Sequence, residues 1–157
     1  MGLINDPYRF ALPSTPQTTG DPTTNASGFQ SNTWFSTYLL LTNGNNIQKI
    51  GIYSGTAGTF TLKIAQQTSA GNYTVVATES VSHGGAGWQD FTLTTPYLIP
   101  GSGNYYAGMY VPGAQVMGYR TSGASRAYKA GDIGLGASGS WSEDSAAGLC
   151  IRVNQGL

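Results

Sequence analysis

Residues 59–64, Thr59-Phe60-Thr61-Leu62-Lys63-Ile64, alternate polar and apolar side chains with a period of two. This pattern is typical of a half-buried β-strand, because successive side chains of a strand point to opposite faces. The turn residues Ala70-Gly71-Asn72 follow, and residues 73–81 alternate in the same way. The stretch therefore predicts two strands of a sheet that buries one face and exposes the other.

Short β-prone runs separated by turn residues continue on both sides of this pair. Residues 33–42 are aromatic and β-prone, and they end in Asn43-Gly44-Asn45-Asn46, which is a strong hairpin signal. Ile50 and Ile52 then share one face of the next strand. Further strands are expected at residues 88–94, 105–111, 116–121, 126–129 and 149–153.

The spacing of these runs predicts the fold class. Every window of helical apolar spacing is interrupted by glycine or proline. Roughly eight to ten short strands separated by turns are typical of a sandwich or barrel. We expect residues 31–157 to form an all-β domain, a jelly-roll-like antiparallel β-sandwich.

The first thirty residues have a different composition. Prolines recur in residues 1–30, and residues 15–24 are almost wholly polar, which disfavours a helix or a central strand. We expect residues 1–30 to form an extended N-terminal arm that anchors the domain to other chains. The prolines concerned are Pro7, Pro13, Pro16 and Pro22.

The chain carries very little charge. Only 9% of its residues are charged, against about a quarter in a typical soluble domain, and seven basic residues balance seven acidic ones. Lys and Arg are scattered singly, which argues against binding to nucleic acid or to an anionic membrane surface. Neutral polar surfaces instead suit contact with copies of the chain or with sugars, because they bury no ions.

The N-terminus suggests where the protein is found. Residues 1–6 lack the basic region and apolar run of a secretory signal, and no stretch approaches the roughly 20 apolar residues of a membrane span. A charge-poor chain without an export signal suits a protein released by lysis, as phage particles are. We therefore expect a location on a virion surface and no insertion into a membrane.

Residues that could support catalysis are few. His83 is the only histidine, and its position beside Gly84 and Gly85 suggests a solvated loop residue. The alternative is a Ser-His-Asp arrangement that includes Asp90, although no G-x-S-x-G motif is present. Cys150, the only cysteine, lies in an apolar run and is expected to be a small buried side chain. We expect a protein that is not an enzyme and uses no cofactor.

The acidic residues give no strong metal or glycosidase signal. Glu143 and Asp144 are adjacent, so they should point apart in an extended segment. With Asp132 they form the best local candidate for calcium, but the alternating acidic spacing of a dedicated loop is missing. We expect no metal site.

Aromatic residues are the remaining candidates for a binding site. Tyrosine and tryptophan offer flat surfaces for sugar rings and a polar tip for hydrogen bonds. The alternative is that most of them lie in the core or in a subunit interface. Trp34 and Trp88 are expected to be packing residues. The candidate glycan or interface platform consists of Tyr106, Tyr110, Tyr119, Tyr128 and Trp141.

Three runs follow one another between residues 47 and 111: Ile47-Gln48-Lys49-Ile50-Gly51-Ile52-Tyr53-Ser54-Gly55, Gly87-Trp88-Gln89-Asp90-Phe91-Thr92-Leu93 and Asn104-Tyr105-Tyr106-Ala107-Gly108-Met109-Tyr110. Their order resembles the framework strands of β-sandwich modules in phage particles and bacterial surface proteins. The resemblance implies a non-catalytic role, as in head-decoration proteins, fibre heads and sugar-binding appendages. It lies in framework positions and implies no particular binding residues.

Two functions are therefore expected. The first is a structural subunit of a phage particle, either a capsid decoration or a head or tail fibre, that forms homo-oligomers (a trimer is favoured) and contacts other virion proteins. The second is a carbohydrate- or receptor-binding β-sandwich module that meets a host surface glycan. A hydrolase built on His83 ranks third.

Overall fold

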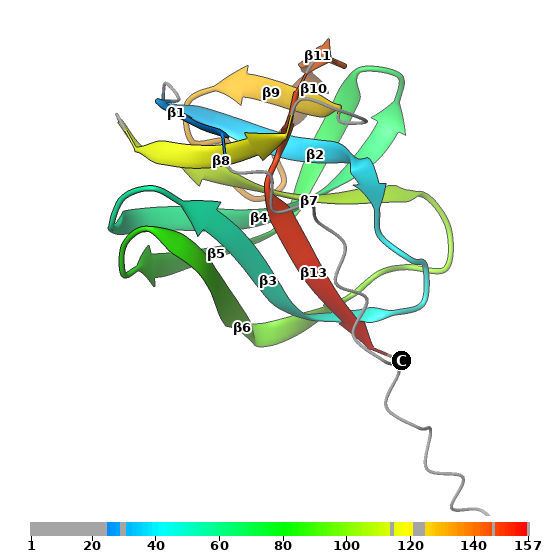
Figure 1. Cartoon of the computed structure of the whole chain (residues 1–157). Coiled ribbons are helices and arrows are strands. Elements are labelled where there is room, and N and C mark those ends of the chain that lie inside the picture. The colour runs from blue at the N-terminus through cyan, green and yellow to red at the C-terminus, as the bar shows by residue number, and fades with distance from the viewer. Residues whose placement is uncertain (1–24, 29–30, 114, 121–124, 146, 157) are drawn as a thin grey trace, which may run out of the picture.

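A computed structural model describes residues 25–28, 31–113, 115–120, 125–145 and 147–156. The regular structure in these ranges is entirely β, and the strands form two antiparallel sheets packed as a sandwich (Figure 1). The expected fold class is confirmed. In the part of the chain that the structure describes, no helix has the length and apolar character needed to cross a bilayer.

The smaller sheet, sheet A, has β3 at its centre. β3 pairs with β6 along one side, and with β13 and then β8 along the other. β1 and β12 pair with β8. The strands of sheet A are β1 (Asn25–Gly28), β3 (Asn46–Ser54), β6 (Gly87–Leu98), β8 (Val116–Arg120), β12 (Gly148–Leu149) and β13 (Ile151–Gly156).

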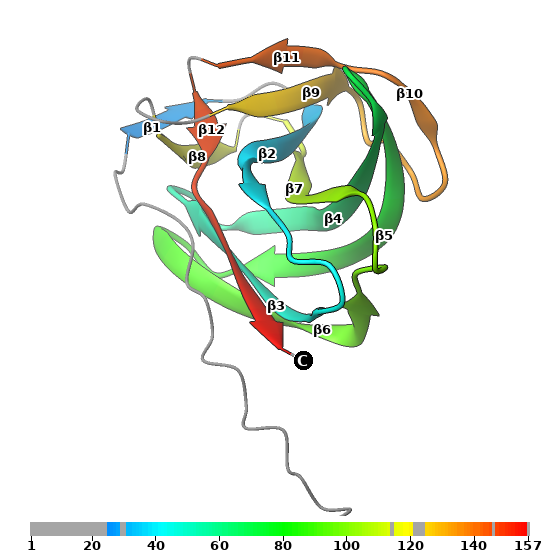
Figure 2. The ribbon, with the colours of Figure 1, turned by 90° about the vertical axis from the view of Figure 1, so that its right-hand side faces the viewer.

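The larger sheet, sheet B, has the strand order β10-β5-β4-β7-β2-β9-β11. Its edge strands β10 and β11 are separated in sequence by Trp141 alone, so the chain joins one edge of the sheet to the other. Sheet B is therefore strongly curled and nearly closed like a barrel (Figure 2). Its strands are β2 (Asn32–Leu40), β4 (Gly58–Ser69), β5 (Asn72–His83), β7 (Asn104–Val111), β9 (Arg126–Ala130), β10 (Ser138–Ser140) and β11 (Ser142–Asp144).

The two turns singled out in the sequence have different outcomes. The expected turn at 70–72 joins β4 to β5 as a hairpin, with Gly71 at φ +70°. The expected hairpin at 43–46 is wrong, because β2 lies in sheet B and β3 in sheet A. Gly44 still turns the chain at φ +82°, but its N–H donates to the carbonyl of Ile99 (2.9 Å). The turn residues allow the chain to reverse direction at this point. The strands on either side then pair with other strands, according to which of their faces is buried.

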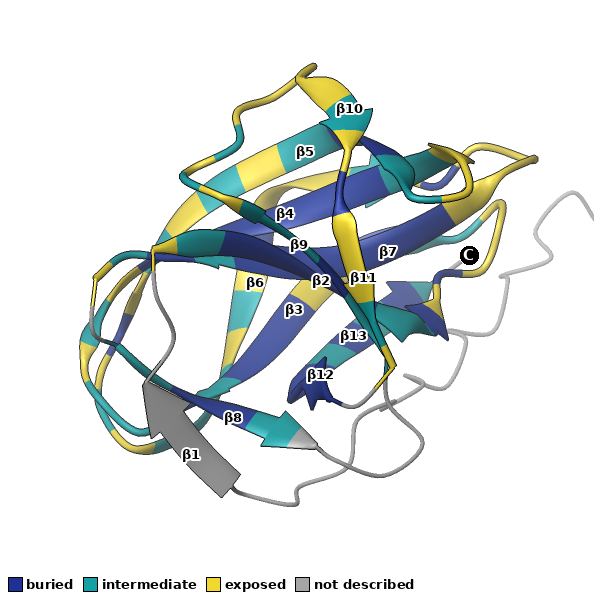
Figure 3. Ribbon diagram, turned by 90° about the horizontal axis from the view of Figure 1, so that it is seen from above, coloured by how far each residue is buried: buried dark blue, intermediate teal, exposed yellow. Residues whose placement is uncertain are grey.

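The main core lies between the sheets and follows the period-two pattern. Phe60, Leu62 and Ile64 of β4 are each at most 1% exposed and face this core. The face of β7 that points toward this core carries Tyr105, Ala107, Met109 and Val111. Buried positions accordingly run along β3, β4 and β7 in Figure 3. The apolar side chains of both strands face this core, although part of the opposite face of each strand is buried as well.

A second core lies on the other face of sheet B, inside its curl. Its members are Phe35, Ala65, Tyr73, Val75, Tyr106, Ala127 and Trp141. Residues 131–145, called the strap below, close over it and bring in β10, Trp141 and β11. No strand was expected in the strap, because its run of glycine and serine gives no alternation.

Lys63 departs from the expected pattern. As the polar member of the 59–64 alternation it should face solvent, yet it is 2% exposed. Its Nζ lies 2.6 Å from Asp132 Oδ1 and donates to the carbonyl of Ile133 (2.7 Å). The strap covers this side chain and supplies both partners. The ion pair and the hydrogen bond offset the cost of removing the ammonium group from water.

The expected N-terminal arm, residues 1–30, lies mostly outside the described residues. Within it, β1 pairs antiparallel with β8 from Asn25 to Gly28. It is the terminal strand in the order β1-β8-β3-β13. The final expected strand, 149–153, corresponds to β12 and β13, and its residues Leu149, Ile151 and Val153 are buried in the main core.

Candidate functional site

The five residues of the expected aromatic platform do not share one surface. Tyr106 and Trp141 are 8% and 7% exposed and belong to the second core. Trp141 packs against Phe35 (ring centroids 5.1 Å apart) and Tyr73 (6.0 Å). These two platform residues therefore match the alternative interpretation, that they are core residues.

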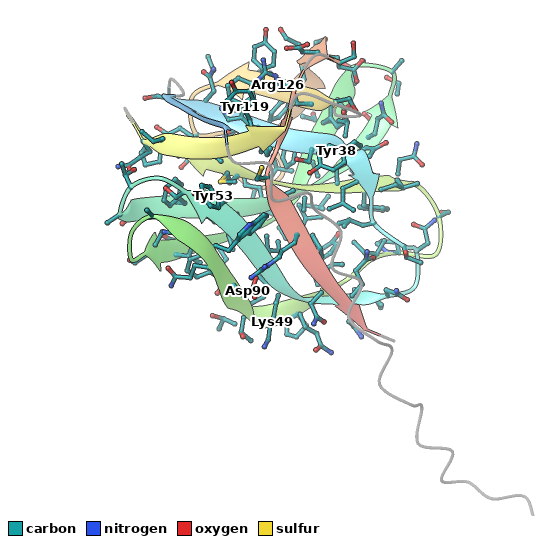
Figure 4. All side chains as sticks on the ribbon, in the orientation of Figure 1. Tyr38, Lys49, Tyr53, Asp90, Tyr119 and Arg126 are labelled. Atoms are coloured by element: carbon teal, nitrogen blue, oxygen red, sulfur yellow. The ribbon has the colours of Figure 1, made fainter. Side chains whose placement is uncertain are left out.

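Tyr119 and Tyr128 lie at the margin of the main core. Both are partly buried against it, and the Tyr128 ring packs against Trp34 with centroids 4.7 Å apart and the ring planes tilted by 30°. The Arg126 guanidinium lies 4.7 Å from the Trp34 ring centroid and 5.7 Å from that of Tyr128 (Tyr119 and Arg126 are labelled in Figure 4). Trp34 is 6% exposed, which confirms it as a packing residue.

His83 is not the solvated loop residue that we expected. It ends β5 with its side chain 4% exposed, between the rings of Phe60 (6.0 Å) and Phe91 (6.1 Å). Its Nδ1 accepts a hydrogen bond from the Gly85 N–H (3.3 Å). The physical reason is register: the strand continues to His83, whose side chain points inward with that of Val81, and the glycines begin only afterwards. The alternative partner Asp90 is bound to Arg152 instead.

The acidic residues of the strap hold separate partners. Asp132 pairs with Lys63, while Asp144 Oδ2 lies 2.7 Å from Arg126 Nη2. Glu143 accepts a hydrogen bond from the Tyr73 hydroxyl, so Glu143 and Asp144 point apart as expected. Among the described residues, no group of three or more His, Cys, Asp and Glu side chains is placed to hold a metal ion. Cys150 is fully buried, as expected.

Burial and the Glu143 carboxylate of the strap raise the pKa values of two tyrosines in the second core. Burial raises the pKa of the Tyr73 hydroxyl well above its usual range, and the hydrogen bond to the Glu143 carboxylate raises it further. Burial also raises the pKa of Tyr106, with a smaller contribution from Glu143. Gln67 bridges the two hydroxyls, at 3.3 Å from Tyr73 and 3.4 Å from Tyr106. These hydroxyls form part of a hydrogen-bond network in the second core.

The raised pKa of Tyr73 predicts a loss of stability in alkaline solution. In the unfolded chain tyrosine ionises near pH 10, while folded Tyr73 keeps its proton to higher pH. Above pH 10 the folded state therefore binds more protons, and the free energy of unfolding falls by up to about 1.4 kcal/mol per pH unit. Thermal unfolding measured between pH 8 and about 11.5 should show this fall.

The variant Tyr73→Phe is the matched control for this titration. It should be less stable at pH 8, because Glu143 loses its donor, and it should lose less stability between pH 10 and 11.5. Equal alkaline slopes for the two proteins would contradict the assignment.

One neutral surface stands out on sheet B outside the strap. Cross-strand partners on β4, β5 and β7 carry hydroxyl side chains on the face opposite the main core. Four of them are exposed, and Thr61 and Tyr110 are half-buried. This hydroxyl face consists of Thr59, Thr61, Thr78, Ser80, Ser82 and Tyr110. It keeps one residue of the expected platform, Tyr110, and carries no charge.

A second surface lies on the outer face of sheet A, where charged and aromatic side chains meet. Arg152 and Asp90 are the two cross-strand partners of Gly51 on β3. Arg152 Nε donates to Asp90 Oδ1 (2.6 Å) and Nη2 to Oδ2 (2.7 Å), so the pair is bidentate. The guanidinium stacks 4.7 Å from the Trp88 ring centroid, and Tyr53 meets Trp88 edge-on at 6.0 Å. Tyr53, Trp88, Asp90 and Arg152 are called the ion-pair cluster below.

This cluster was missed in the sequence because its members come from three strands. Trp88 was expected to be a packing residue, and it packs against Arg152 and Tyr53 while it lies half-buried on the outer face. The available signal was parity: Phe91 and Leu93 point inward, which places Trp88 and Asp90 on the opposite face. Arg152 could not be linked to them without the pairing of β13 with β3.

Comparison with protein-family models, with curated proteins and with solved structures found no match to this chain.

Proposed function

We propose that this chain is a non-enzymatic structural subunit that assembles with copies of itself through the hydroxyl face. The observation that carries the proposal is the internal pairing of its charges. In the described ranges, three ion pairs take up six charged side chains. Two further carboxylates accept internal hydrogen bonds, that of Glu79 from Thr94 and that of Glu143 from Tyr73.

Because these charges are paired elsewhere, the hydroxyl face carries no ion, and little free energy is needed to remove water from it. Burying a face that carries free Lys or Glu requires the removal of water from ions, which costs several kcal/mol per ion. Hydroxyl groups can instead exchange hydrogen bonds with water for hydrogen bonds with a second copy. Tyr110 adds apolar area with a polar tip, a residue type enriched in interfaces. The other copy of the chain is thus a chemically matched partner for this face.

The composition and the order of the three framework runs support a place in a phage particle, as a capsid decoration or a fibre subunit. Closed cyclic symmetry is the usual arrangement of identical subunits, and we propose a trimer. Mass spectrometry of purified particles that carry the gene tests this placement. Particles that lack the protein would contradict it.

The assembly is tested by placing one charge on the hydroxyl face. Ser80 is exposed on β5, and Ser80→Glu would bury an unpaired carboxylate in the interface. A cost of about 3 kcal/mol should raise the dissociation constant about a hundredfold. Size-exclusion chromatography with light scattering should show an oligomer for the wild type and a shift to monomer for the variant.

Ser102→Glu is the matched control, because Ser102 is an exposed serine in the loop before β7 and is not on the hydroxyl face. It should leave the oligomer intact. A wild-type protein that is monomeric at the highest concentration measured, or an equal effect of both substitutions, would refute the proposed interface.

A further inference from the structure

We propose that the ion-pair cluster on the outer face of sheet A binds a neutral sugar through adjacent hydroxyl groups. The inference goes beyond the assembly role and does not depend on it, because the hydroxyl face belongs to the other sheet. It also places the expected sugar contact away from Tyr106 and Trp141, which are buried.

Two glycines leave space on the sheet for the side chains of the cluster. A Cβ atom at Gly51 would lie 2.1 Å from Asp90 Oδ1 and 2.7 Å from Arg152 Cγ, so only glycine lets the pair meet across β3. A Cβ atom at Gly118 on β8 would lie 2.7 Å from Tyr53 Cδ1. The Tyr53 side chain therefore lies close over Gly118, and it remains half-buried. Figure 4 shows Tyr53 and Asp90 on the outer side of β3 and β6.

The ion pair keeps hydrogen-bonding capacity for a ligand. Each Asp90 oxygen takes one bond from Arg152 and retains a further lone pair, while Arg152 Nη1 has N–H groups outside the bidentate bond. The two side chains are 48% and 30% exposed. A carboxylate that accepts and a guanidinium that donates, side by side, match two adjacent hydroxyls, each of which can do both. Stacking on Trp88 fixes the guanidinium, so less side-chain entropy is lost on binding.

The aromatic part of the cluster suits the apolar face of a sugar ring. Tyr53 is half-buried on β3 and is the cross-strand partner of Trp88. The edge-to-face contact between the two rings holds Tyr53 in one orientation. A ring fixed in this way offers contact area to the C–H groups of a sugar while the ion pair holds its hydroxyls.

Charge favours a neutral ligand. Arg152 and Asp90 neutralise each other. An anionic ligand would be repelled by Asp90, and a cationic ligand would be repelled by Arg152. Lys49 lies on the same face of β3, two residues before Gly51, and it is exposed. If Lys49 provided the attraction, the ligand would be anionic and its binding would weaken steeply with salt. The variant Lys49→Ala therefore separates the two chemistries.

The experiment is a glycan array of neutral and acidic oligosaccharides, probed with the full chain at low and high salt. Wild-type protein should bind a set of neutral glycans with little salt dependence. Asp90→Ala and Tyr53→Ala should each lower affinity at least tenfold for the same glycans, while thermal unfolding shows that both variants remain folded. Leu98→Ala, which removes an exposed side chain of β6 outside the cluster, and Lys49→Ala should bind like the wild type.

Three results would overturn the proposal. They are no binding to any neutral glycan by the wild type, equal binding by the folded Asp90→Ala and Tyr53→Ala variants, and binding that disappears in Lys49→Ala or in high salt. Oligomerisation is measured in a separate experiment. A negative glycan array would refute the sugar site without affecting the assembly proposal, and a monomeric protein would refute the assembly proposal without affecting the sugar site.

Discussion

Replacing Trp141 with alanine is expected to lower the free energy of unfolding by about 3–5 kcal/mol. Trp141 is 7% exposed and packs on Phe35 and Tyr73. It also lies between β10 and β11, the two edge strands of sheet B, and its backbone N–H donates to the carbonyl of Gly71 in the turn between β4 and β5 (2.8 Å). The substitution leaves a large cavity in a small core, and that core cannot close without moving the strap.

Urea unfolding measures this loss, and limited proteolysis shows where it acts. Cleavage should appear first in residues 131–145, because the strap loses its main apolar contact. Leu135→Ala is the control, since Leu135 lies in the same segment but is 66% exposed. It should change stability by no more than about 0.5 kcal/mol. Comparable losses for the two variants would show that Trp141 does not hold the strap.

The second large effect is expected for Gly108→Ala, at about 3 kcal/mol or more. Gly108 lies on β7, between β4 and β2 in the middle of sheet B. A Cβ atom there would lie 2.0 Å from the Trp34 carbonyl oxygen and 2.9 Å from Phe35 Cα. These are backbone atoms of a neighbouring strand, so the clash can be relieved only by separating β7 from β2.

Urea unfolding, together with the yield of folded protein, measures the effect of Gly108→Ala. Gly101→Ala is its control, because no atom lies within 4 Å of a Cβ at Gly101 and the position does not require a positive φ. This variant should unfold at nearly the same urea concentration as the wild type. If Gly108→Ala also did so, the close approach of β7 to β2 would be refuted.

Much of the fold was predictable because one rule connects sequence to burial in a sheet. The alternation at 59–64, and the shared face of Tyr105, Ala107, Met109 and Val111, follow from the two-residue period of a strand. Lys63 is the instructive exception, since the sequence places it opposite the main core but cannot show that the strap covers that side. The same limit applies to Tyr106 and Trp141. The sequence suggests that they are surface aromatics, but the curl of sheet B and the strap bury them.

The candidate sites were less predictable, because each is assembled across strands that are distant in sequence. Arg152 and Asp90 are 62 residues apart and meet only because β13 and β6 flank β3. His83 was assigned to a loop because glycines follow it, although β5 continues to that residue. Turn residues mark where a chain can reverse, and they do not specify which strand pairs next, as the 43–46 turn illustrates.

The sequence by itself determined that this chain is all-β, that its main strands follow a two-residue period, and that few charges are available for its surface. Alternation involves only residues adjacent in sequence and composition is a count over the chain, so those conclusions require no knowledge of strand pairing. Only the tertiary structure decided which charges neutralise each other, which aromatics are covered, and which remain on the outer faces. Those outcomes depend on strand order and on the closure of sheet B by the strap, and both are long-range pairings that no local pattern encodes.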